Sequence, residues 1–353
     1  MKIKIIILGL ATALLSAGCN MFSTPAAAGV VKTVNGGADW QFSNVLKGGS
    51  ANIGQLNIAK LDFDPSNRET VFVGSYSGGL YKSEDSGASW TNILSKIAIY
   101  DFAINSGDPK IIYAAGIYAS QGKVLKSVDG GASWQQVYND AGQNNAVRVV
   151  ALNPQAPQQL IIGTNSGSLI KSADGGQTWQ LMANFSDPVM RVFWQPNAVL
   201  VLLKTKGLFS GGFASAQAGD FQELTKSIVK TSPTDYLYTE PFAFNQGFVD
   251  SVTGSLIYLT TSRGLYKSTD GGQTWNQLAL PVKQTESNAR AITIARTSSN
   301  LVFTSVGSVI YKSTDGGASW QTQNIPTSGF INYILTDPQL PQIAYAGIYV
   351  PAQ

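Results

Sequence analysis

The chain has 353 residues, of which only 13% are charged, with 24 Lys and Arg against 21 Asp and Glu. Globular domains usually have a charged fraction of roughly 25%, and the 36 glycines indicate a turn-rich β protein. No histidine occurs, and Cys19 is the only cysteine. Histidine-dependent nucleophile systems, His-ligated metals, intrachain disulfides and thiolate zinc sites are therefore excluded. We expect no metal and no cofactor.

The N-terminus predicts a secretory signal. Two lysines precede 14 uncharged residues, Ile5–Gly18, which are too few for a permanent membrane helix. The segment Leu15-Ser-Ala-Gly-Cys19 resembles the bacterial lipobox, in which the cysteine is acylated. We therefore expect a signal peptide over residues 1–18, then a lipidated Cys19 and flexible tether over residues 19–29. The alternative is cleavage after Ala28, which would release a soluble secreted protein.

An acylated Cys19 would hold the protein at the cell envelope, outside the cytoplasm, with the lipid as its membrane contact. Asn20 in place of an aspartate predicts outer-membrane sorting in a Gram-negative host. Without Lys2 and Lys4, the chain carries 22 basic residues (24 minus 2) against 21 acidic ones. No basic residues are clustered along the chain, so we expect no nucleic-acid partner. The six arginines are scattered: Arg68, Arg148, Arg191, Arg263, Arg290 and Arg296.

Internal repeats indicate the fold. The pattern K-S-x-D-x-G-x-[ST]-W occurs five times, and a worn sixth copy ends at Trp40. The closing tryptophans are spaced 50, 44, 45, 96 and 45 residues apart. The interval of 96 residues is about two periods, so one unit without its signature is expected around Lys206–Phe209. Each unit contains alternating apolar runs separated by Asp-Pro or Asn-Pro turns and glycines, which is typical of four short strands.

Seven such units predict an all-β, seven-bladed β-propeller of four-stranded blades over residues 30–353. The first repeat lacks its two preceding strands, and the segment after Ile331 lacks a following repeat. We therefore expect residues 30–46 and 330–353 to combine into one blade. Closure by strands from both termini leaves the ring without an open seam.

The residues that recur in each repeat have a structural explanation. Its glycines permit a tight turn, and its aspartate can accept hydrogen bonds from turn N–H groups. Its tryptophan can cover the hairpin. We interpret these residues as structural, and they are Asp85, Trp90, Asp129, Trp134, Asp174, Trp179, Asp270, Trp275, Asp315 and Trp320.

The five full repeats resemble the Asp-box, or BNR, repeat family. That superfamily includes sialidases, xyloglucan-cleaving glycoside hydrolases, the luminal domain of sortilin and photosystem II assembly factors. The phrase G-L-Y-K-S-x-D-G-G-x-[ST]-W, with its Asp-Pro turns, is more similar to the sortilin, xyloglucanase and assembly-factor branch. The Arg-Ile-Pro motif of sialidases is absent. The resemblance implies a propeller fold, and fold alone does not imply activity.

Polar residues on the expected inner strands are the candidates for a site. A glycosidase of the xyloglucanase type would need two carboxylates, for which the non-box candidates are Asp62, Asp101 and Glu240. The expected binding face around the central funnel comprises Lys60, Arg148, Arg191, Arg290, Tyr236 and Tyr238.

Two functions remain open. The first is a non-enzymatic binding or assembly scaffold for a protein or polysaccharide partner. The alternative is a glycoside hydrolase with a carboxylate pair at the mouth of the propeller. An enzyme should show two non-box carboxylates facing each other across a cleft. A binding module should show a charged or apolar patch without such a pair.

Overall fold

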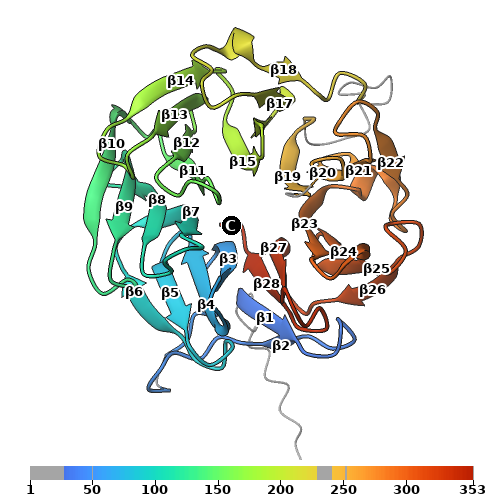
Figure 1. The fold of residues 1–353 in the computed structure, drawn as a ribbon. Coiled ribbons are helices and arrows are strands. Elements are labelled where there is room, and N and C mark those ends of the chain that lie inside the picture. Colours follow the sequence, from blue (N-terminus) through green and yellow to red (C-terminus); the bar gives the residue numbers. More distant parts are fainter. Residues whose placement is uncertain (1–27, 50, 229–240, 251–252, 353) are drawn as a thin grey trace, which may run out of the picture.

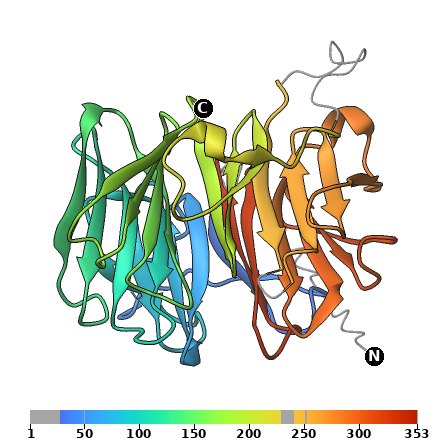
Figure 2. The same ribbon diagram turned by 45° about the horizontal axis from the view of Figure 1, so that its top comes forward.

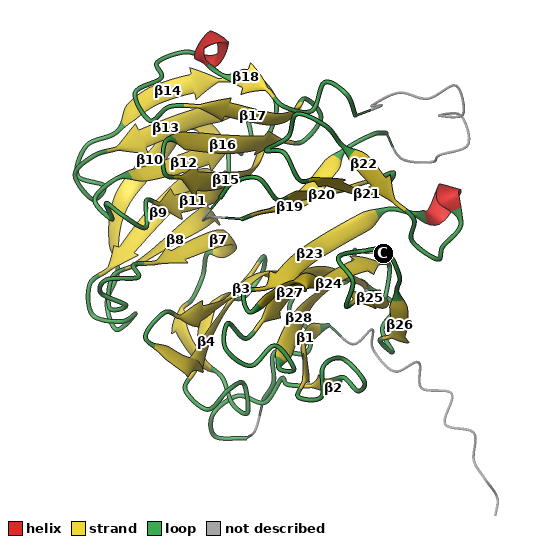
Figure 3. Ribbon diagram, turned by 45° about the vertical axis from the view of Figure 1, so that its right-hand side comes forward, coloured by secondary structure: helices red, strands yellow, loops and turns green. Residues whose placement is uncertain are grey.

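The computed structural model describes residues 28–49, 51–228, 241–250 and 253–352. Its strands form seven four-stranded antiparallel sheets arranged as a ring, which confirms the predicted propeller (Figure 1). In the described residues, helix is limited to single-turn 3₁₀ segments at Ala218–Asp220 and Gln284–Glu286 (Figure 3).

The blades are numbered along the chain, and each is given from its inner to its outer strand. Blade 1 is β3 (Ile58–Asp64), β4 (Asn67–Ser75), β5 (Gly79–Ser83) and β6 (Thr91–Leu94). Blade 2 is β7 (Ala98–Ile104), β8 (Ile112–Tyr118), β9 (Gln121–Ser127) and β10 (Gln135–Gln143). Blade 3 is β11 (Val147–Leu152), β12 (Leu160–Thr164), β13 (Ser168–Ser172) and β14 (Gln180–Asn184).

The second half of the ring follows the same order. Blade 4 is β15 (Val189–Gln195), β16 (Ala198–Leu203), β17 (Gly207–Gly211) and β18 (Gln222–Glu223). Blade 5 is β19 (Phe244–Val249), β20 (Ile257–Thr261), β21 (Gly264–Ser268) and β22 (Asn276–Leu278). Blade 6 is β23 (Ala289–Ala295), β24 (Ser298–Val306), β25 (Val309–Ser313) and β26 (Gln321–Asn324).

Blade 7 closes the ring with strands from both ends of the chain. Its order is β27 (Phe330–Thr336), β28 (Ala344–Tyr349), β1 (Gly29–Thr33) and β2 (Gln41–Phe42). The seam is the antiparallel pairing of β1 with β28, from Gly29 opposite Ile348 to Thr33 opposite Ala344. Five paired positions hold the two termini together, as the incomplete first and last repeats predict.

Hydrogen bonds from the repeat residues join neighbouring blades. Trp179 of blade 3 donates from Nε1 to the Val137 carbonyl of blade 2 at 2.8 Å. In return, Tyr113 Oη and Lys126 Nζ of blade 2 donate to the Gly175 carbonyl in the box of blade 3, at 2.9 and 3.0 Å. Equivalent pairs of Tyr and Lys bonds reach the boxes of blades 1 and 6. Apolar side chains fill the same seams, so the core lies between the blades.

The ring has two different faces, between which the strands run (Figure 2). Because strands alternate in direction within a blade, the turn after strand one and the box turn after strand three lie on the same face. Gly175 in a box turn accordingly donates to the Gln158 carbonyl in the first turn of its blade at 2.9 Å. We call this the box face. The opposite face, where the chain enters each inner strand, is the entry face.

Candidate functional site

A β-bulge recurs near the start of every inner strand. In β11, for example, Val147 pairs with Thr164 and Val149 pairs with Gly163, which leaves Arg148 as the extra residue. A bulge redirects the side chain of the extra residue and is common beside binding sites. The residues in the bulged positions are Ala59, Tyr100, Arg148, Met190, Asn245, the pair Arg290 and Ala291, and Asn332.

Most of these bulged positions line one cavity on the entry face. The cavity has a volume of about 510 Å³ and includes Tyr100, Arg148, Met190, Asn245, Arg290 and Asn332 in its wall. Arg191 and the exposed Lys204 complete its positive side chains, and none of its described lining residues is acidic. We call this cavity the cationic mouth. The repeated bulge is therefore the device that brings scattered residues of the sequence to one site.

Four aromatic rings form an arc along the wall of the cationic mouth, which we call the aromatic belt: Phe330, Tyr349, Tyr76 and Tyr100. Their centroids are separated by 5.1 Å, 5.7 Å and 5.0 Å in that order. An arginine lies at each end of the belt. The Arg290 guanidinium is 3.6 Å from the centroid of Phe330, and that of Arg148 is 5.4 Å from the centroid of Tyr100. Cation–π contacts orient both guanidinium groups beside the cavity.

The charge of Arg148 is poorly compensated. Burial lowers the pKa of its guanidinium below the usual value, and the nearby positive charge of Arg191 acts in the same direction. Its Nη1 donates to Asn165 Oδ1 at 3.3 Å, but its buried Nε has no hydrogen-bond partner. A buried donor without a partner costs free energy. An anionic group that entered the cavity would supply both the missing acceptor and the missing negative charge.

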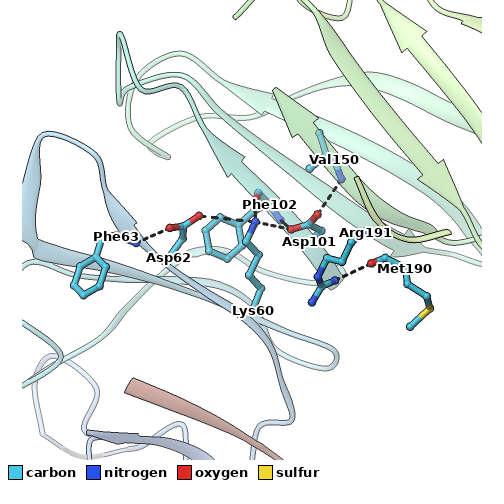
Figure 4. A network of polar contacts seen from close by, with 8 residues as sticks. All are labelled: Lys60, Asp62, Phe63, Asp101, Phe102, Val150, Met190 and Arg191. Atoms are coloured by element: carbon cyan, nitrogen blue, oxygen red, sulfur yellow. Dashed lines mark hydrogen bonds and ion pairs between the residues drawn. The ribbon is translucent and has the colours of Figure 1, made fainter. Parts of the chain in front are cut away.

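The floor of the cationic mouth contains a network of charged side chains (Figure 4). Arg191 of blade 4 lies 5.8 Å from the ring centroid of Tyr333 in blade 7, although these blades are not neighbours in the ring. Its side chain therefore reaches across the central channel. Below it, Lys60 forms ion pairs with Asp101 at 2.8 Å and with Asp62 at 3.8 Å.

Asp101 is fully engaged in this network. Its carboxylate accepts hydrogen bonds from the Phe102 N–H at 2.8 Å and the Val150 N–H at 3.1 Å, in addition to the ion pair with Lys60. Only 4% of the residue is exposed. Burial by itself lowers the pKa of Lys60, but Asp101, Tyr333 and Asp62 together outweigh burial and raise that pKa above the usual value. Asp101 thus joins blades 1, 2 and 3 through these contacts.

Asp62 lies toward the other end of the channel. Its side chain is 40% exposed and lines a larger cavity, of about 1120 Å³, on the box face. Burial raises the pKa of Asp62, against the opposing charges of Lys60 and Arg296. We call this cavity the acidic mouth, because its wall contains four carboxylates: Asp62, Asp64, Glu69 and Asp250. It also contains Arg68, which pairs with Asp337 at 3.4 Å, and Arg296.

The structure thus brings Arg148, Arg191 and Arg290 into one cavity, and separates Lys60 from them as part of the floor. The two described carboxylate candidates, Asp62 and Asp101, meet at Lys60 and do not face each other across a cleft. Glu240, Tyr236, Tyr238 and Cys19 lie outside the described residues. Sequence reasoning missed the aromatic belt, whose only sequence signal is that Tyr100 occupies the same strand position as Arg148.

The box residues form turns that line neither of the two mouths. Asp174 accepts hydrogen bonds from the Thr178 N–H at 2.9 Å and from the Ser172 hydroxyl at 2.8 Å, and the Thr178 hydroxyl binds its second oxygen. These bonds lower the pKa of Asp174 to about 2. The Ser172 hydroxyl in turn accepts a hydrogen bond from the N–H of Gly176. Gly176 has a φ of 90°, a conformation that favours glycine. Asp85, Asp129, Asp270 and Asp315 have the same bonds.

The described residues contain neither a metal-binding cluster nor a membrane-spanning helix. No group of three or more His, Cys, Asp or Glu side chains gathers there in an arrangement suited to a metal ion. Within those same residues, no helix is long and apolar enough to cross a membrane.

Comparison with known proteins supports the repeat and the fold. A model of the BNR/Asp-box repeat matches residues 266–277. No curated protein matches the chain. Solved structures with the same fold include the GH74 xyloglucanase from Xanthomonas campestris, at 16% identity and a TM-score of 0.66. That match covers 83% of this chain and 51% of the xyloglucanase, so the chain spans about half the length of that enzyme.

The photosystem II-associated protein YCF48 is a second kind of structural neighbour. YCF48 bound to D1 peptide matches at 15% identity and a TM-score of 0.60, over 84% of this chain and 93% of that one. YCF48 from Cyanidioschyzon merolae matches at 12% identity and a TM-score of 0.61, over 83% and 95% of the two chains. At these identities the comparisons show a shared fold. Both an enzyme and a binding protein occur among the neighbours.

Proposed function

We propose that this seven-bladed Asp-box propeller is a non-enzymatic binding module that holds an anionic group of a protein or polysaccharide partner in its cationic mouth. The observation that carries the proposal is the composition of that cavity. Arg148, Arg191, Arg290 and Lys204 share about 510 Å³, and none of the described lining residues is acidic. Arginine binds carboxylates and phosphates in a bidentate geometry, and aromatic rings beside it add contact area without charge.

The structural neighbours favour this function over the enzymatic one, because they differ in the share of their length that matches this chain. YCF48, which is recorded bound to a peptide, matches along nearly its whole chain, whereas the xyloglucanase contains about twice the matched length. The site geometry supports the same choice. A glycosidase needs one protonated and one ionised carboxyl group on opposite sides of the scissile bond. Asp101 is instead saturated with hydrogen bonds, and Lys60 lies between it and Asp62.

Direct binding assays test the proposal. The protein beginning at Asn20 would be titrated with a poly-glutamate peptide and with polygalacturonate, each compared with a neutral analogue of similar length. We expect Arg148→Gln and Arg290→Gln each to weaken binding about tenfold, because a hydrogen bond to a charged group contributes roughly 1.5–3 kcal/mol. Arg296→Gln, in the acidic mouth, is the matched control and should bind normally. Unchanged affinity in the two mouth variants would refute the proposal.

The glycoside hydrolase alternative has its own test. The same protein would be assayed on xyloglucan, β-glucans and sialosides. Turnover that disappears in Asp101→Asn or Glu240→Gln, with the melting temperature unchanged, would replace the binding function with an enzymatic one. We expect no turnover.

We also propose that Cys19 is acylated and holds the propeller at the outer surface of a membrane in the cell envelope, the outer membrane in a Gram-negative host. The lipobox-like segment before Cys19 supports this location. Cys19→Ala should move the protein from the membrane fraction to the soluble fraction. Retention of this variant in the membrane would point to a different anchor, and release of the unaltered protein would favour secretion.

A further inference from the structure

The charged side chains around the two mouths differ in sign. The cationic mouth on the entry face has four basic and no acidic side chains among its described lining residues. The acidic mouth on the box face has four carboxylates against Arg68 and Arg296, and Arg68 already pairs with Asp337. The chain as a whole is nearly neutral, with 24 basic and 21 acidic residues. The two mouths therefore carry opposite charge, positive at the entry face.

The described chain begins on the entry face. The Ala28 N–H donates to the Gly54 carbonyl at 2.9 Å, and the Gly29 N–H donates to the Leu56 carbonyl at 3.1 Å, in the loop that leads into β3. Gly29 also pairs with Ile348, the residue before Tyr349 of the aromatic belt. The segment that precedes Ala28 is thus attached beside the cationic mouth.

We propose that the entry face is turned toward the membrane that holds the anchor, and that the cationic mouth docks on its anionic lipid headgroups. This inference rests on the proposed anchor and deepens the proposed function by naming headgroup phosphates as anions bound at the mouth. Eight residues lie between Cys19 and Ala28, and at about 3.5 Å per step from one Cα to the next this connection reaches about 30 Å at most. Such a short connection holds the face from which it leaves close to the bilayer.

The chemistry of the mouth suits this surface. An anionic leaflet attracts basic side chains over about a Debye length, roughly 8–10 Å, and repels carboxylates. The opposite charges of the two mouths therefore orient the entry face toward the membrane and the acidic mouth away from it. Tyrosine and arginine side chains are also favourable at the level of the headgroups. Soluble anionic partners then compete with lipid phosphates for Arg148 and Arg290.

Site-specific quenching tests the orientation. In the full-length lipidated protein, a fluorophore would be attached at Lys283→Cys, in the loop that leads into β23 on the entry face, or at Lys110→Cys on the box face. Both lysines are exposed and lie outside the wall of the cationic mouth. The Lys110 carbonyl accepts from the box residue Gly130, which places it on the box face. In vesicles with a headgroup-linked quencher, we expect at least threefold stronger quenching at position 283. Equal quenching, or stronger quenching at position 110, would overturn the proposed orientation.

Vesicle binding without the anchor tests the docking. Residues 28–352 contain both closing segments of the ring, so the protein beginning at Asn20 retains the fold. It should sediment with phosphatidylglycerol vesicles and not with phosphatidylcholine vesicles. Each of Arg148→Gln and Arg290→Gln should weaken this binding about fivefold, whereas Lys110→Gln should not. Free glycerol phosphate at millimolar concentration should compete poorly if the extended surface contributes.

The outcomes separate this inference from the proposed function. If poly-glutamate binds in an arginine-dependent manner but anionic vesicles do not bind, the membrane inference is wrong and the binding function stands. If vesicles bind and neither poly-glutamate nor polygalacturonate does, the protein or polysaccharide partner is wrong and the membrane inference stands. Equal binding to both kinds of vesicle would also refute the inference.

Discussion

The buried ion pair between Lys60 and Asp101 yields the sharpest prediction about stability. In Asp101→Ala, the ammonium group of Lys60 loses its partner at 2.8 Å, and the N–H groups of Phe102 and Val150 lose their acceptor. Removing one partner of a buried ion pair typically costs about 3–5 kcal/mol. Asp62, already 3.8 Å from Lys60 and partly exposed, can compensate in part. We therefore expect a loss of about 3 kcal/mol in the free energy of unfolding.

The double variant Lys60→Met, Asp101→Leu isolates the charge from the packing. It removes both charges, leaves the two N–H groups without an acceptor, at roughly 1–3 kcal/mol, and removes the Lys60 donor from the Phe102 carbonyl. It should therefore be no less stable than Asp101→Ala, although it carries one substitution more. Urea denaturation followed by tryptophan fluorescence measures the unaltered protein, the two single variants Lys60→Met and Asp101→Ala, and the double variant. A change below about 0.5 kcal/mol in Asp101→Ala, or additive losses in the double variant, would refute the assignment of Asp101 to structure.

Three further predictions concern the box turns. Hydrogen bonds lower the pKa values of Asp129, Asp174 and Asp270 to about 2. The ionised carboxylates therefore contribute fully to stability above about pH 4, and this contribution is lost as the pH falls through about 2. The melting temperature should fall across that window, and less so in Asp174→Asn, if these carboxylates act as described. Trp179→Phe keeps the ring but removes the bond to the Val137 carbonyl and should cost about 1 kcal/mol in urea denaturation. Gly176→Ala places a side chain at a φ of 90° and should destabilise by about 1 kcal/mol or more; unchanged midpoints would contradict both.

The sequence predicted the fold because the same residues recur where the same turn recurs. A turn that needs a glycine, an acceptor and a tryptophan at fixed spacing cannot vary without loss of its hydrogen bonds. For the same reason the spacing of 96 residues could be interpreted as two repeat periods with one box missing. Blade 4 indeed forms without a box, and Phe221 packs into its core. The closing blade followed from counting strands at the two ends of the chain.

The site was harder to predict because it depends on register. Arg148, Arg191 and Arg290 belong to three blades, and only the bulge near the start of each inner strand places side chains of different blades in one cavity. A bulge adds one residue and reverses the alternation of side chains after it. Alternating hydrophobicity therefore identifies these strands but not the residue that points into the channel. The aromatic belt is less predictable still, since Tyr76 follows a strand and Tyr349 ends one.

The two faces of the ring differ in how strongly the repeat constrains their residues. On the box face, repeat residues bind the neighbouring blade through hydrogen bonds that any substitution would weaken. On the entry face, the bulged residue of each inner strand is released from the regular ladder, and residues as different as Tyr100, Arg148, Met190 and Asn332 occupy the equivalent position. That position carries none of the hydrogen bonds of the repeat, although Asn245 and Asn332 use it to bond the next blade, so its side chain differs from blade to blade. The cationic character of the mouth is thus a property of this chain, which the propeller scaffold permits but does not require.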